Sequence, residues 1–597
     1  MPLLAANRRA LATRFPEVLR LLESVAPVAN PPASTAEETP GFIDEAARCS
    51  RLCLVLTGLP GPATTAALLR RCPREILFWC VEPAAEALAA RLSAADCSVW
   101  LADPRVFLSL GAPAAPELRR LNRELAWVDR ARALFLPTRY AGREADWKPV
   151  LAATLSRIQQ RWQNVLTDLK LAPVRWENTC ANLPTFLASP AIDSLAGAFI
   201  GAPLVLVAAG PSLDDALPFL QRVAPHALIV TGNTSFRAIA AHGLSPHLTV
   251  TVDPFPATDL GYDNCPLGNT HLVSPVFGYS GVHRRFAGRL FGMTDQSPLL
   301  ARLRSAAGLP PAPPLLGEAT VSSTVLNLAA YFGCTRVVFV GQDFAIADDG
   351  RSHASDTFYT DLGINRHDHE QVHRLPGTTR PEVTVPARHL WYLRTVEGHI
   401  ARAPHIRHLN TSHRGAAIAG APYMTYDRVA TELLAQPARD YAAEIAARHS
   451  AAIASSAAAA MSAELDHARA AIRDAFELSL TAALSGELAL ADPEPAARQR
   501  FEAAAARFEQ WRAAHQAEQP LLFEGRTKAE IFDAEKRRVA LPAATDRALR
   551  EAGEIAWAFA EGAASVHRQL ATVALPTAAS DTAPSHASAR ATTASVP

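Results

Sequence analysis

The chain has 597 residues, of which 49% are hydrophobic and 19% are charged. This composition is too apolar for a chain that is disordered throughout, and the length predicts about two to four domains. The 58 Lys and Arg side chains balance the 58 Asp and Glu side chains, which argues against a nucleic-acid coat or a polybasic membrane anchor.

Secretion and membrane insertion are not expected. No apolar run reaches the about 20 residues that a transmembrane helix needs. Charged residues interrupt the N-terminal segment MPLLAANRRALATRF, where a secretory signal requires an apolar stretch, so we expect a cytoplasmic protein. The eight cysteines include no C-x-x-C pair, and we interpret them as buried thiols rather than a disulfide or metal framework.

Residues 1–190 are expected to form an α/β domain. Three apolar runs of strand length, RLCLVLTG, EILFWCVE and CSVWLAD, are each followed by a turn. The first ends at Gly58, and the acidic Glu82 follows about 20 residues later, which is the order of a nucleotide-binding strand–turn–helix unit. Pro60 and Pro62 lack the N–H groups that a ligand would need, so we interpret this fingerprint as degenerate.

Residues 191–427 are expected to form the central domain, which carries the candidate chemistry. The continuous apolar run Leu204–Ala208 is typical of a parallel strand covered on both faces. The turn after it contains Gly210, Pro211 and Ser212, and an acidic pair follows in the expected first turn of the next helix. A glycine permits close approach of a phosphate, and free N–H groups at a helix start attract an anion. A tight turn with Ser212 as a helix cap is the alternative.

Further apolar runs of the central domain end in polar residues. Asn233 and Asp253 each close one run, and Gly341, Gln342 and Asp343 close another. Each of these residues alone is equally typical of a cap or a turn. Because the carboxyl ends of parallel strands form one edge of a sheet, where ligands bind in open α/β folds, we expect these side chains to share a crevice with the Gly210 turn.

Three segments beside these strands supply further candidates. A helix is expected to begin near Ser322 and Ser323, which can cap it or contact a phosphate. His353 lies in a polar loop after the Asp343 run, where a histidine can act as a base, with a solvated loop histidine as the alternative. The segment LNTSHRG places Asn410 and Ser412 in a strand-to-turn setting.

A group of histidines in the same domain has a spacing that can ligate zinc. Its members are His367, His369 and His373. Because no second metal-binding motif accompanies them, we predict no metal site there.

Residues 428–575 are Ala-rich and are expected to form a helical domain, followed by a disordered Ser/Thr/Ala/Pro tail at 576–597. One helix shows the i, i+3, i+4, i+7 spacing of an apolar face through Phe501, Ala504, Ala505, Phe508 and Trp511. We expect these side chains to pack in a core rather than to contact a cofactor.

The order of the central motifs, AAGPSL, GN, VTVDP, GEATVSST, VGQDFA with a following SHA, and LNTSHRGAAIAG, resembles the motility-associated factor (Maf) family of flagellin glycosyltransferases. The GPSL turn also resembles the nucleotide-binding turn of bacterial sialyltransferases. The resemblance implies an α/β fold: a central doubly wound, mostly parallel sheet of the sialyltransferase-like, Rossmann type, preceded by a smaller α/β domain and followed by a helical domain. The chain departs from the family pattern at Phe344, where leucine is more usual, and at Glu318, where a second glycine is usual.

The family implies transfer of a nonulosonic acid of the pseudaminic or legionaminic type from a CMP-activated donor to Ser or Thr hydroxyls of flagellin. His353 is then the first candidate for the general base, and Asp343 is its rival. No cofactor is expected to be required, with Mg²⁺ as the one candidate, and neither nucleic acid nor membrane is an expected partner. The residues expected to contact the nucleotide sugar are Gly210, Pro211, Ser212, Asn233, Asp253, Ser322, Ser323, Gly341, Gln342, Asn410 and Ser412.

Two alternatives stay open. The central domain also resembles archaeal 6-hydroxymethyl-dihydropterin pyrophosphokinases, which implies ATP as the donor and Asp253 and Asp343 as Mg²⁺ ligands. Those relatives consist essentially of the central domain, whereas the long flanking segments of this chain suit a macromolecular acceptor better. A non-catalytic flagellin-binding scaffold is the second alternative, and the polar strand ends argue against it.

Overall fold

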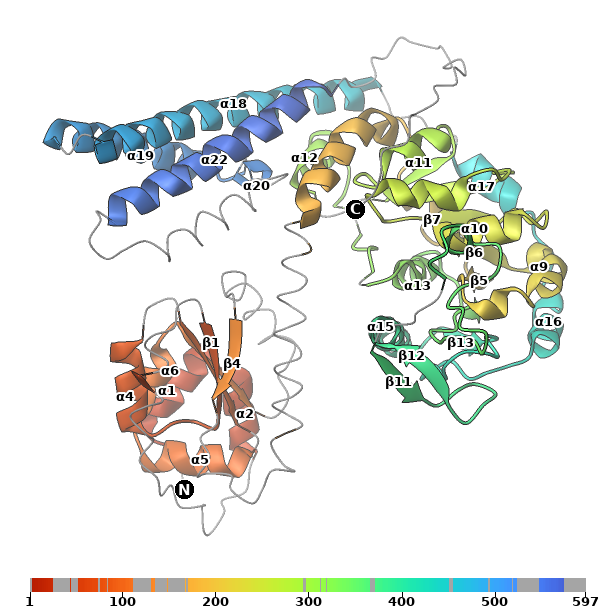
Figure 1. Cartoon of the computed structure of the whole chain (residues 1–597), viewed down its shortest axis with the longest axis horizontal. Helices are drawn as coiled ribbons and strands as arrows, with labels where there is room; N and C mark the ends of the chain where they lie inside the picture. The colour runs from red at the N-terminus through yellow and green to blue at the C-terminus, as the bar shows by residue number, and fades with distance from the viewer. Residues whose placement is uncertain are drawn as a thin grey trace. The chain divides into compact units, whose positions relative to one another are not determined.

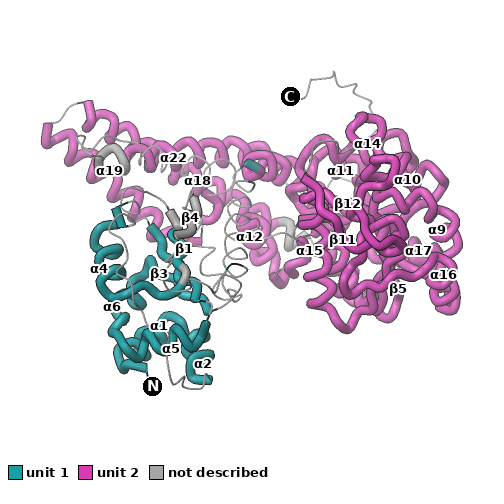
Figure 2. The backbone as a smooth tube through the Cα atoms, turned by 60° about the horizontal axis from the view of Figure 1, so that its bottom comes forward, with its two compact units in different colours: residues 1–170, 532–547 teal, residues 171–531, 548–597 magenta. Residues whose placement is uncertain are grey.

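The computed structural model of this chain forms two compact units, residues 1–170 with 532–547 and residues 171–531 with 548–597 (Figure 2). The predicted tail at 576–597 and the histidines His367 and His369 lie outside the described residues. The structure describes residues 3–24, 43–44, 52–72, 76–82, 84–110, 130–134, 148, 167, 170–293, 297–311, 313–317, 319–365, 371–449, 455–491, 494–517, 519–522 and 547–573.

The first unit contains a four-stranded parallel sheet in the order β3-β2-β1-β4. Its strands are β1 (Leu52–Thr57), β2 (Leu77–Glu82), β3 (Val106–Leu110) and β4 (Arg130–Leu134), and its helices are α1 (Ala5–Arg14), α2 (Pro16–Glu23), α4 (Pro62–Arg71), α5 (Ala85–Ala94) and α6 (Ser98–Ala102). The prediction of a strand in CSVWLAD was wrong, because this run forms α6. The Asp96 carboxylate accepts the Ser98 N–H at 2.9 Å at the start of the helix, and Trp100 and Leu101 are buried.

The degenerate fingerprint of this unit has an internal role. Gly58 adopts a left-handed conformation with φ of 84°, and the Leu59 N–H approaches the buried Glu82 carboxylate at 3.4 Å. The acidic residue therefore contacts the glycine turn of its own domain.

The second unit contains a seven-stranded sheet, parallel throughout, in the order β13-β10-β5-β6-β7-β8-β9 (Figure 1). The first strand of this sheet in chain order, β5, lies in its interior, and the following strands are added outward to β9. The chain then crosses back to add β10 and β13 on the other side of β5. This confirms the predicted doubly wound α/β fold and places its switch point between β5 and β10. The strands are β5 (Pro203–Val207), β6 (Leu228–Gly232), β7 (Leu248–Val250), β8 (His271–Pro275), β9 (Leu290–Met293), β10 (Arg336–Val340) and β13 (Arg407–Asn410).

Helices cover both faces of this sheet, because side chains alternate between the faces along each strand. Leu204 and Leu206 of β5 pack into one core with α13, α15 and α17, whereas Val205 and Val207 pack into a second core with α9, α10 and α16. The helices are α9 (Leu217–Val223), α10 (Asn233–Ala240), α13 (Val321–Tyr331), α15 (Ala387–Arg402), α16 (Tyr426–Leu434) and α17 (Tyr441–His449). The continuous apolar run of β5 thus reflects burial on two sides.

Smaller elements complete this part of the unit. The β11–β12 hairpin precedes α15 and forms a separate antiparallel pair. The elements are α11 (Ser280–Arg285), α12 (Pro298–Ala306), α14 (Phe358–Asp361), β11 (Val372–Leu375), β12 (Val383–Pro386) and the 3-10 helices η2 (Ile192–Leu195), η3 (Pro211–Leu213), η4 (Ala224–His226) and η5 (Pro256–Tyr262).

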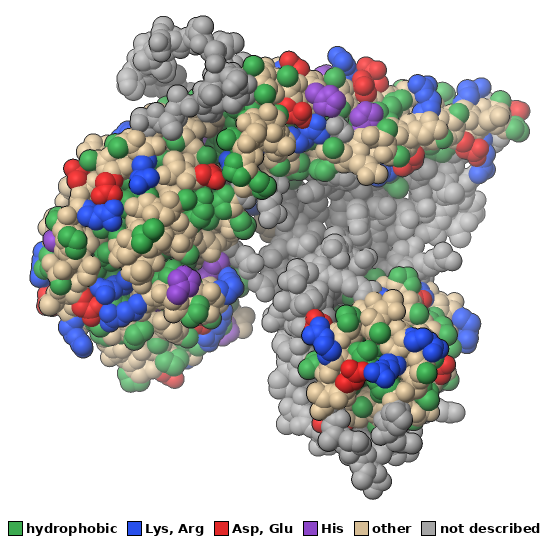
Figure 3. All heavy atoms as spheres, turned by 180° about the vertical axis from the view of Figure 1, so that it is seen from behind, with side chains coloured by type: hydrophobic (Ala, Val, Ile, Leu, Met, Phe, Trp, Pro, Cys, Tyr) green, Lys and Arg blue, Asp and Glu red, His purple; other side chains and the backbone are tan. Residues whose placement is uncertain are grey.

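The C-terminal segment is helical, comprising α18 (Ser455–Ala491), α19 (Pro495–Ala514), α20 (Gln519–Leu522) and α22 (Arg547–Ala571). The predicted apolar face of α19 is confirmed, because Phe501, Ala504, Phe508 and Trp511 are buried. Helix α18 packs against α12, where Arg302 and Glu464 form an ion pair at 2.5 Å. Acidic and basic side chains are interspersed over the face in Figure 3. None of the described helices combines the length and hydropathy that crossing a bilayer requires.

Replacement of a core residue on β5 tests this architecture. Leu206 is 1% exposed, so Leu206→Ala is expected to lower the free energy of unfolding by about 2–5 kcal/mol through the cavity it leaves. Leu434→Ala, at the end of α16 where the side chain is 40% exposed, should cost much less. Chemical denaturation of both variants measures the difference, and equal losses would contradict the interior position of β5.

Candidate functional site

The carboxyl ends of β5 and β10 meet at the switch point of the sheet. Pairing continues beyond the strands themselves, since the Ala208 N–H donates to Val340 O at 2.8 Å and the Gly210 N–H donates to Gly341 O at 2.7 Å. The predicted turn at Gly210 therefore lies directly against the predicted polar end of β10. In open α/β sheets this is the edge where ligands bind.

A buried carboxylate occupies the turn. The Ser212 N–H donates to Asp343 Oδ2 at 2.8 Å, and the Ser212 hydroxyl donates to Asp343 Oδ1 at 2.5 Å. A Cβ on Gly210 would overlap Asp343 Oδ2 and would lie 2.6 Å from Gly341 O. The close approach that glycine permits here is made by a carboxylate of the protein itself, and that carboxylate already pairs with donors expected to face a phosphate. Nucleotide binding by Gly210, Pro211 and Ser212 stays a prediction.

The segment that follows β13 wraps around the same carboxyl-bearing residue. The Ala416 N–H donates to Asp343 O at 2.9 Å, and a Cβ on Gly415 would lie 2.6 Å from Asp343 Cα. The Arg414 N–H donates to the Ser212 hydroxyl oxygen at 3.1 Å, and the Tyr426 hydroxyl donates to Ser212 O at 2.9 Å. Ser212 and Asp343 thus join β5, β10, α16 and the segment after β13.

The environment of Asp343 favours its neutral form. Burial raises the pKa of this carboxyl from 3.8 to about 6, while the Ser212 hydrogen bonds and the Arg414 charge act in the opposite direction. The next residue, Phe344, is buried and adopts a left-handed backbone with φ of 54°, which costs free energy for a residue with a side chain. Strain of this kind next to a buried carboxyl is typical of functional sites.

Four of the predicted polar residues form one hydrogen-bond chain. The Ser322 hydroxyl at the start of α13 donates to Gln342 Oε1 at 2.7 Å, the Gln342 N–H donates to the Ser412 hydroxyl oxygen at 2.7 Å, and the Ser412 N–H donates to Asn410 Oδ1 at 2.9 Å. Asn410 is fully buried, and its Nδ2 has no hydrogen-bond partner among the described residues. The Ser323 hydroxyl donates to Thr320 O at 2.7 Å within the helix start.

Asn233 and Asp253 lie at the ends of β6 and β7. Asn233 is 7% exposed and opens α10, which has no side-chain cap. The Ser235 hydroxyl connects this helix start to β5 by donating to Val207 O at 2.7 Å. The Asp253 side chain is exposed, yet the surrounding protein raises its pKa, with the Arg175 charge acting in the opposite direction.

His353 lies in the loop between β10 and α14. Its Nδ1 is 2.8 Å from the Ser352 hydroxyl, and its ring stacks on Tyr359 with centroids 4.0 Å apart and planes 7° apart. Burial raises the pKa of Tyr359, the Arg388 charge lowers it, and the negative charge of Asp253 raises it. The predicted Asp253 therefore acts electrostatically on the tyrosine that stacks on His353.

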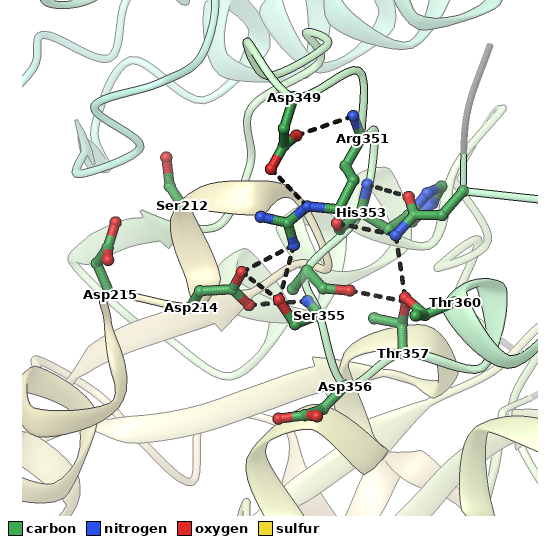
Figure 4. Close-up of polar contacts among 12 residues, drawn as sticks. Ser212, Asp214, Asp215, Asp349, Arg351, His353, Ser355, Asp356, Thr357 and Thr360 are labelled. Carbon is green, nitrogen blue, oxygen red and sulfur yellow. Dashed lines mark hydrogen bonds and ion pairs between the residues drawn. The ribbon is translucent and has the colours of Figure 1, made fainter.

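The acidic pair after the turn binds the neighbouring loops. Asp214 accepts hydrogen bonds from the Ser355 N–H and hydroxyl, each at 2.9 Å, and from Arg351 Nη1 at 3.0 Å (Figure 4). Asp215 accepts from Arg414 Nη2 at 2.6 Å. The expectation that this pair opens a helix was wrong, since a 3-10 turn at Pro211–Leu213 precedes it and α9 begins at Leu217.

Sequence reasoning missed several residues that organise the site. Tyr359, Asn365 and Tyr426 contact His353 or Ser212, although none of them belongs to a motif with a known spacing. The acidic pair Asp214 and Asp215, directly after the turn, was the one sequence feature that could have indicated contacts between the turn and these loops. Of the three histidines with zinc-like spacing, His373 lies on β11. The described residues contain no group of three or more His, Cys, Asp or Glu side chains placed to hold a metal ion.

Comparisons with known proteins bear on the fold. The family model described as 6-hydroxymethylpterin diphosphokinase MptE-like matches residues 177–349. No curated protein matches the chain. A solved structure of the MAf glycosyltransferase from Magnetospirillum magneticum AMB-1 superposes with a TM-score of 0.57 at 15% identity, covering 95% of this chain and 95% of that chain. The predicted resemblance to the Maf family is confirmed: this chain has the Maf fold.

The turn after β5 predicts an unequal tolerance of alanine at two glycines. Gly210→Ala forces Asp343 or Gly341 to move and is expected to cost about 1–3 kcal/mol of stability. Gly232→Ala at the end of β6 meets only Val321 Cγ1 at 3.5 Å and should change stability by less than about 0.5 kcal/mol. Denaturation of both variants tests the contact, and a neutral Gly210→Ala would contradict it.

Asp343 also predicts a pH dependence. Its folded pKa of about 6 lies above its usual 3.8, so the folded protein binds this proton more tightly than the unfolded chain does. The resulting stabilisation is complete below the unfolded pKa and is lost as pH rises through the folded pKa. A rise of the pKa from 3.8 to about 6 corresponds to about 3 kcal/mol of unfolding free energy.

Asp343→Asn removes this titration. The unfolding free energy of the unaltered protein minus that of Asp343→Asn is expected to fall as pH rises from about 4 to about 7. Denaturant titrations across this range measure it. A difference that stays constant would show that folding does not raise the pKa of Asp343.

Proposed function

We propose that this chain is a glycosyltransferase that moves a nonulosonic acid of the pseudaminic or legionaminic type from a CMP-activated donor to Ser or Thr hydroxyls of flagellin. The observation that carries the proposal is the Maf fold, which extends over 95% of the chain and includes the segments on both sides of the central sheet. A small-molecule kinase domain would not account for those segments.

The proposed reaction makes three chemical demands. A CMP-activated keto sugar loses its phosphate leaving group through an oxocarbenium-like transition state, so the enzyme must bind the nucleotide, stabilise the departing phosphate and accept a proton from a weakly acidic alcohol. Polar groups at one sheet edge, near a histidine, meet these demands in principle. Donor binding is assigned to the strand ends, with Asn233 and Asp253 bonding the base or ribose and Ser322 near the phosphate.

His353 is the better candidate for the general base. Its ring stacks on Tyr359, and the Asp253 charge acts on that tyrosine. Asp343 has a pKa suited to proton transfer, but it is 2% exposed and both carboxylate oxygens accept hydrogen bonds from Ser212. We therefore assign Asp343 to positioning the turn. We assign no required metal, since the donor carries a good leaving group, and Mg²⁺ stays the one candidate.

The pyrophosphokinase alternative has one observation in its favour, the family-model match to residues 177–349. In that function Asp253 and Asp343 bind Mg²⁺, and ATP is the donor. The burial of Asp343 weighs against it, since this carboxylate is 2% exposed and both of its oxygens accept hydrogen bonds from Ser212, which leaves little access for a hydrated metal ion.

A panel of nucleotides separates these functions. Thermal unfolding is followed with CMP, CDP, UDP, GDP and ATP, each with and without Mg²⁺. A ligand at about 100 times its dissociation constant stabilises the unit that binds it by about 2.7 kcal/mol. Stabilisation by CMP alone supports the transferase, stabilisation by ATP only with Mg²⁺ supports the kinase, and no response to any nucleotide supports a scaffold.

His353→Ala is expected to reduce transfer to flagellin by about 10²–10⁴-fold, because the alcohol loses its proton acceptor. Nucleotide binding should be retained, since no donor contact is assigned to this ring. Mass spectrometry of flagellin incubated with enzyme and CMP-activated donor measures transfer, and calorimetry measures CMP binding. His373→Ala on β11 is the control, and full activity of His353→Ala would remove this residue from the mechanism.

A further inference from the structure

The buried side chain of Asn365 makes hydrogen bonds to both the N–H and the carbonyl of His353. Its Oδ1 accepts the His353 N–H at 2.8 Å and the Ser352 N–H at 3.2 Å. Its Nδ2 donates to His353 O at 3.2 Å and to the Thr360 hydroxyl at 3.1 Å. Asn365 is 6% exposed, so water does not readily replace these contacts. One carboxamide thus fixes the peptide units on both sides of the His353 Cα.

The hydroxyl of Ser352 connects the imidazole to the same carboxamide. It lies 2.8 Å from His353 Nδ1 and 3.5 Å from Asn365 Oδ1. Asn365 Oδ1 can only accept hydrogen bonds, so it offers the Ser352 hydroxyl proton an acceptor other than His353 Nδ1. With the Ser352 proton directed to Asn365 Oδ1, the Ser352 oxygen accepts from His353 Nδ1–H. In that arrangement the imidazole is protonated at Nδ1, and a base acts through Nε2.

Other contacts fix this loop relative to the switch point. The Ala354 N–H donates to Ala209 O at 2.8 Å. Asp214 bonds Arg351 and Ser355, which lie two residues before and two residues after His353 (Figure 4). The stacked Tyr359 ring restricts rotation of the imidazole. The backbone and ring of His353 therefore have defined positions beside the β5 turn.

We propose that Ser352 and Asn365 are positioning residues that fix the orientation and the tautomer of His353, so that Nε2 is the atom that accepts the acceptor's proton. The catalytic consequence rests on the proposed glycosyl transfer. The tautomer itself does not depend on which reaction the site performs.

Three variants and one control test the proposal. Asn365→Ala removes the acceptor for two backbone N–H groups, and Ser352→Ala removes the partner of Nδ1. Asn365→Asp retains an acceptor oxygen but adds a negative charge beside Ser352. Asp356→Ala is the matched control, because this exposed residue of the same loop pairs with His242 at 2.9 Å and contacts neither Ser352 nor Asn365.

Transfer kinetics give the first readout. Ser352→Ala and Asn365→Ala are expected to lower kcat about 10–100-fold, with little change in KM for the donor. This is the usual loss when a residue that orients a functional side chain is replaced. Asn365→Asp should recover part of kcat and move the acidic limb of the pH profile to higher pH, because a carboxylate stabilises the imidazolium. Rates equal to those of Asp356→Ala in all three variants would overturn the proposal.

Two readouts do not require activity. Hydrogen exchange by mass spectrometry should show faster exchange across 351–357 in Asn365→Ala and unchanged exchange in Asp356→Ala. Imidazole ¹⁵N shifts, with His353 identified as the signal missing from His353→Ala, should show protonation at Nδ1 in the unaltered chain. Protonation at Nε2 would overturn the proposal. If no donor supports transfer but the Nδ1 tautomer is found, the proposed function fails and the positioning role stands.

Discussion

The arrangement of the candidate site depends on one buried hydrogen-bonded pair, the Asp343 carboxylate and Ser212 of the turn after β5. A carboxyl group without solvent is costly unless its oxygens are paired, and here both oxygens accept hydrogen bonds from Ser212. Three glycines leave space for this contact. A side chain at Gly210 or Gly415 would collide with Asp343, and one at Gly341 would lie 2.5 Å from Ala208 O. These glycines are explained by an interaction within the protein.

The loops of the site extend from this pair through charged contacts. The two acids after the turn bind different partners, Asp214 the loop that carries His353 and Asp215 the segment after β13. Each ion pair taken alone is worth little at a surface. Because the two acids are adjacent and follow a turn that Asp343 fixes, Asp214 places the His353 loop and Asp215 places the segment after β13 relative to the same turn. A change at the turn would therefore reach the histidine without contact between them.

The fold and the positions of the polar strand ends could be predicted because they depend on local patterns. An unbroken apolar run such as Leu204–Ala208 implies a strand buried on both faces, and parallel topology then collects the strand ends at one edge. The partner of each polar group could not be predicted. Ser212 and Asp343 are 131 residues apart, and nothing in the sequence near either one indicates the other. Run length also failed at Ser98–Ala102, where five residues are too few to separate a strand from a helical turn.

A shared sheet edge serves different reactions, so the fold does not by itself select the chemistry. The family-model match ends at residue 349, shortly before His353 and the residues that orient it. Asp253 and Asp343, the two acids that a kinase mechanism would need, lie inside the matched segment. Both oxygens of Asp343 accept hydrogen bonds from Ser212 of the turn. His353, the preferred candidate for the base, lies outside the matched segment. In the proposed function the sheet edge holds the nucleotide of the donor and the loop from Arg351 to Asn365 acts on the acceptor, whereas in the kinase alternative the same edge holds ATP.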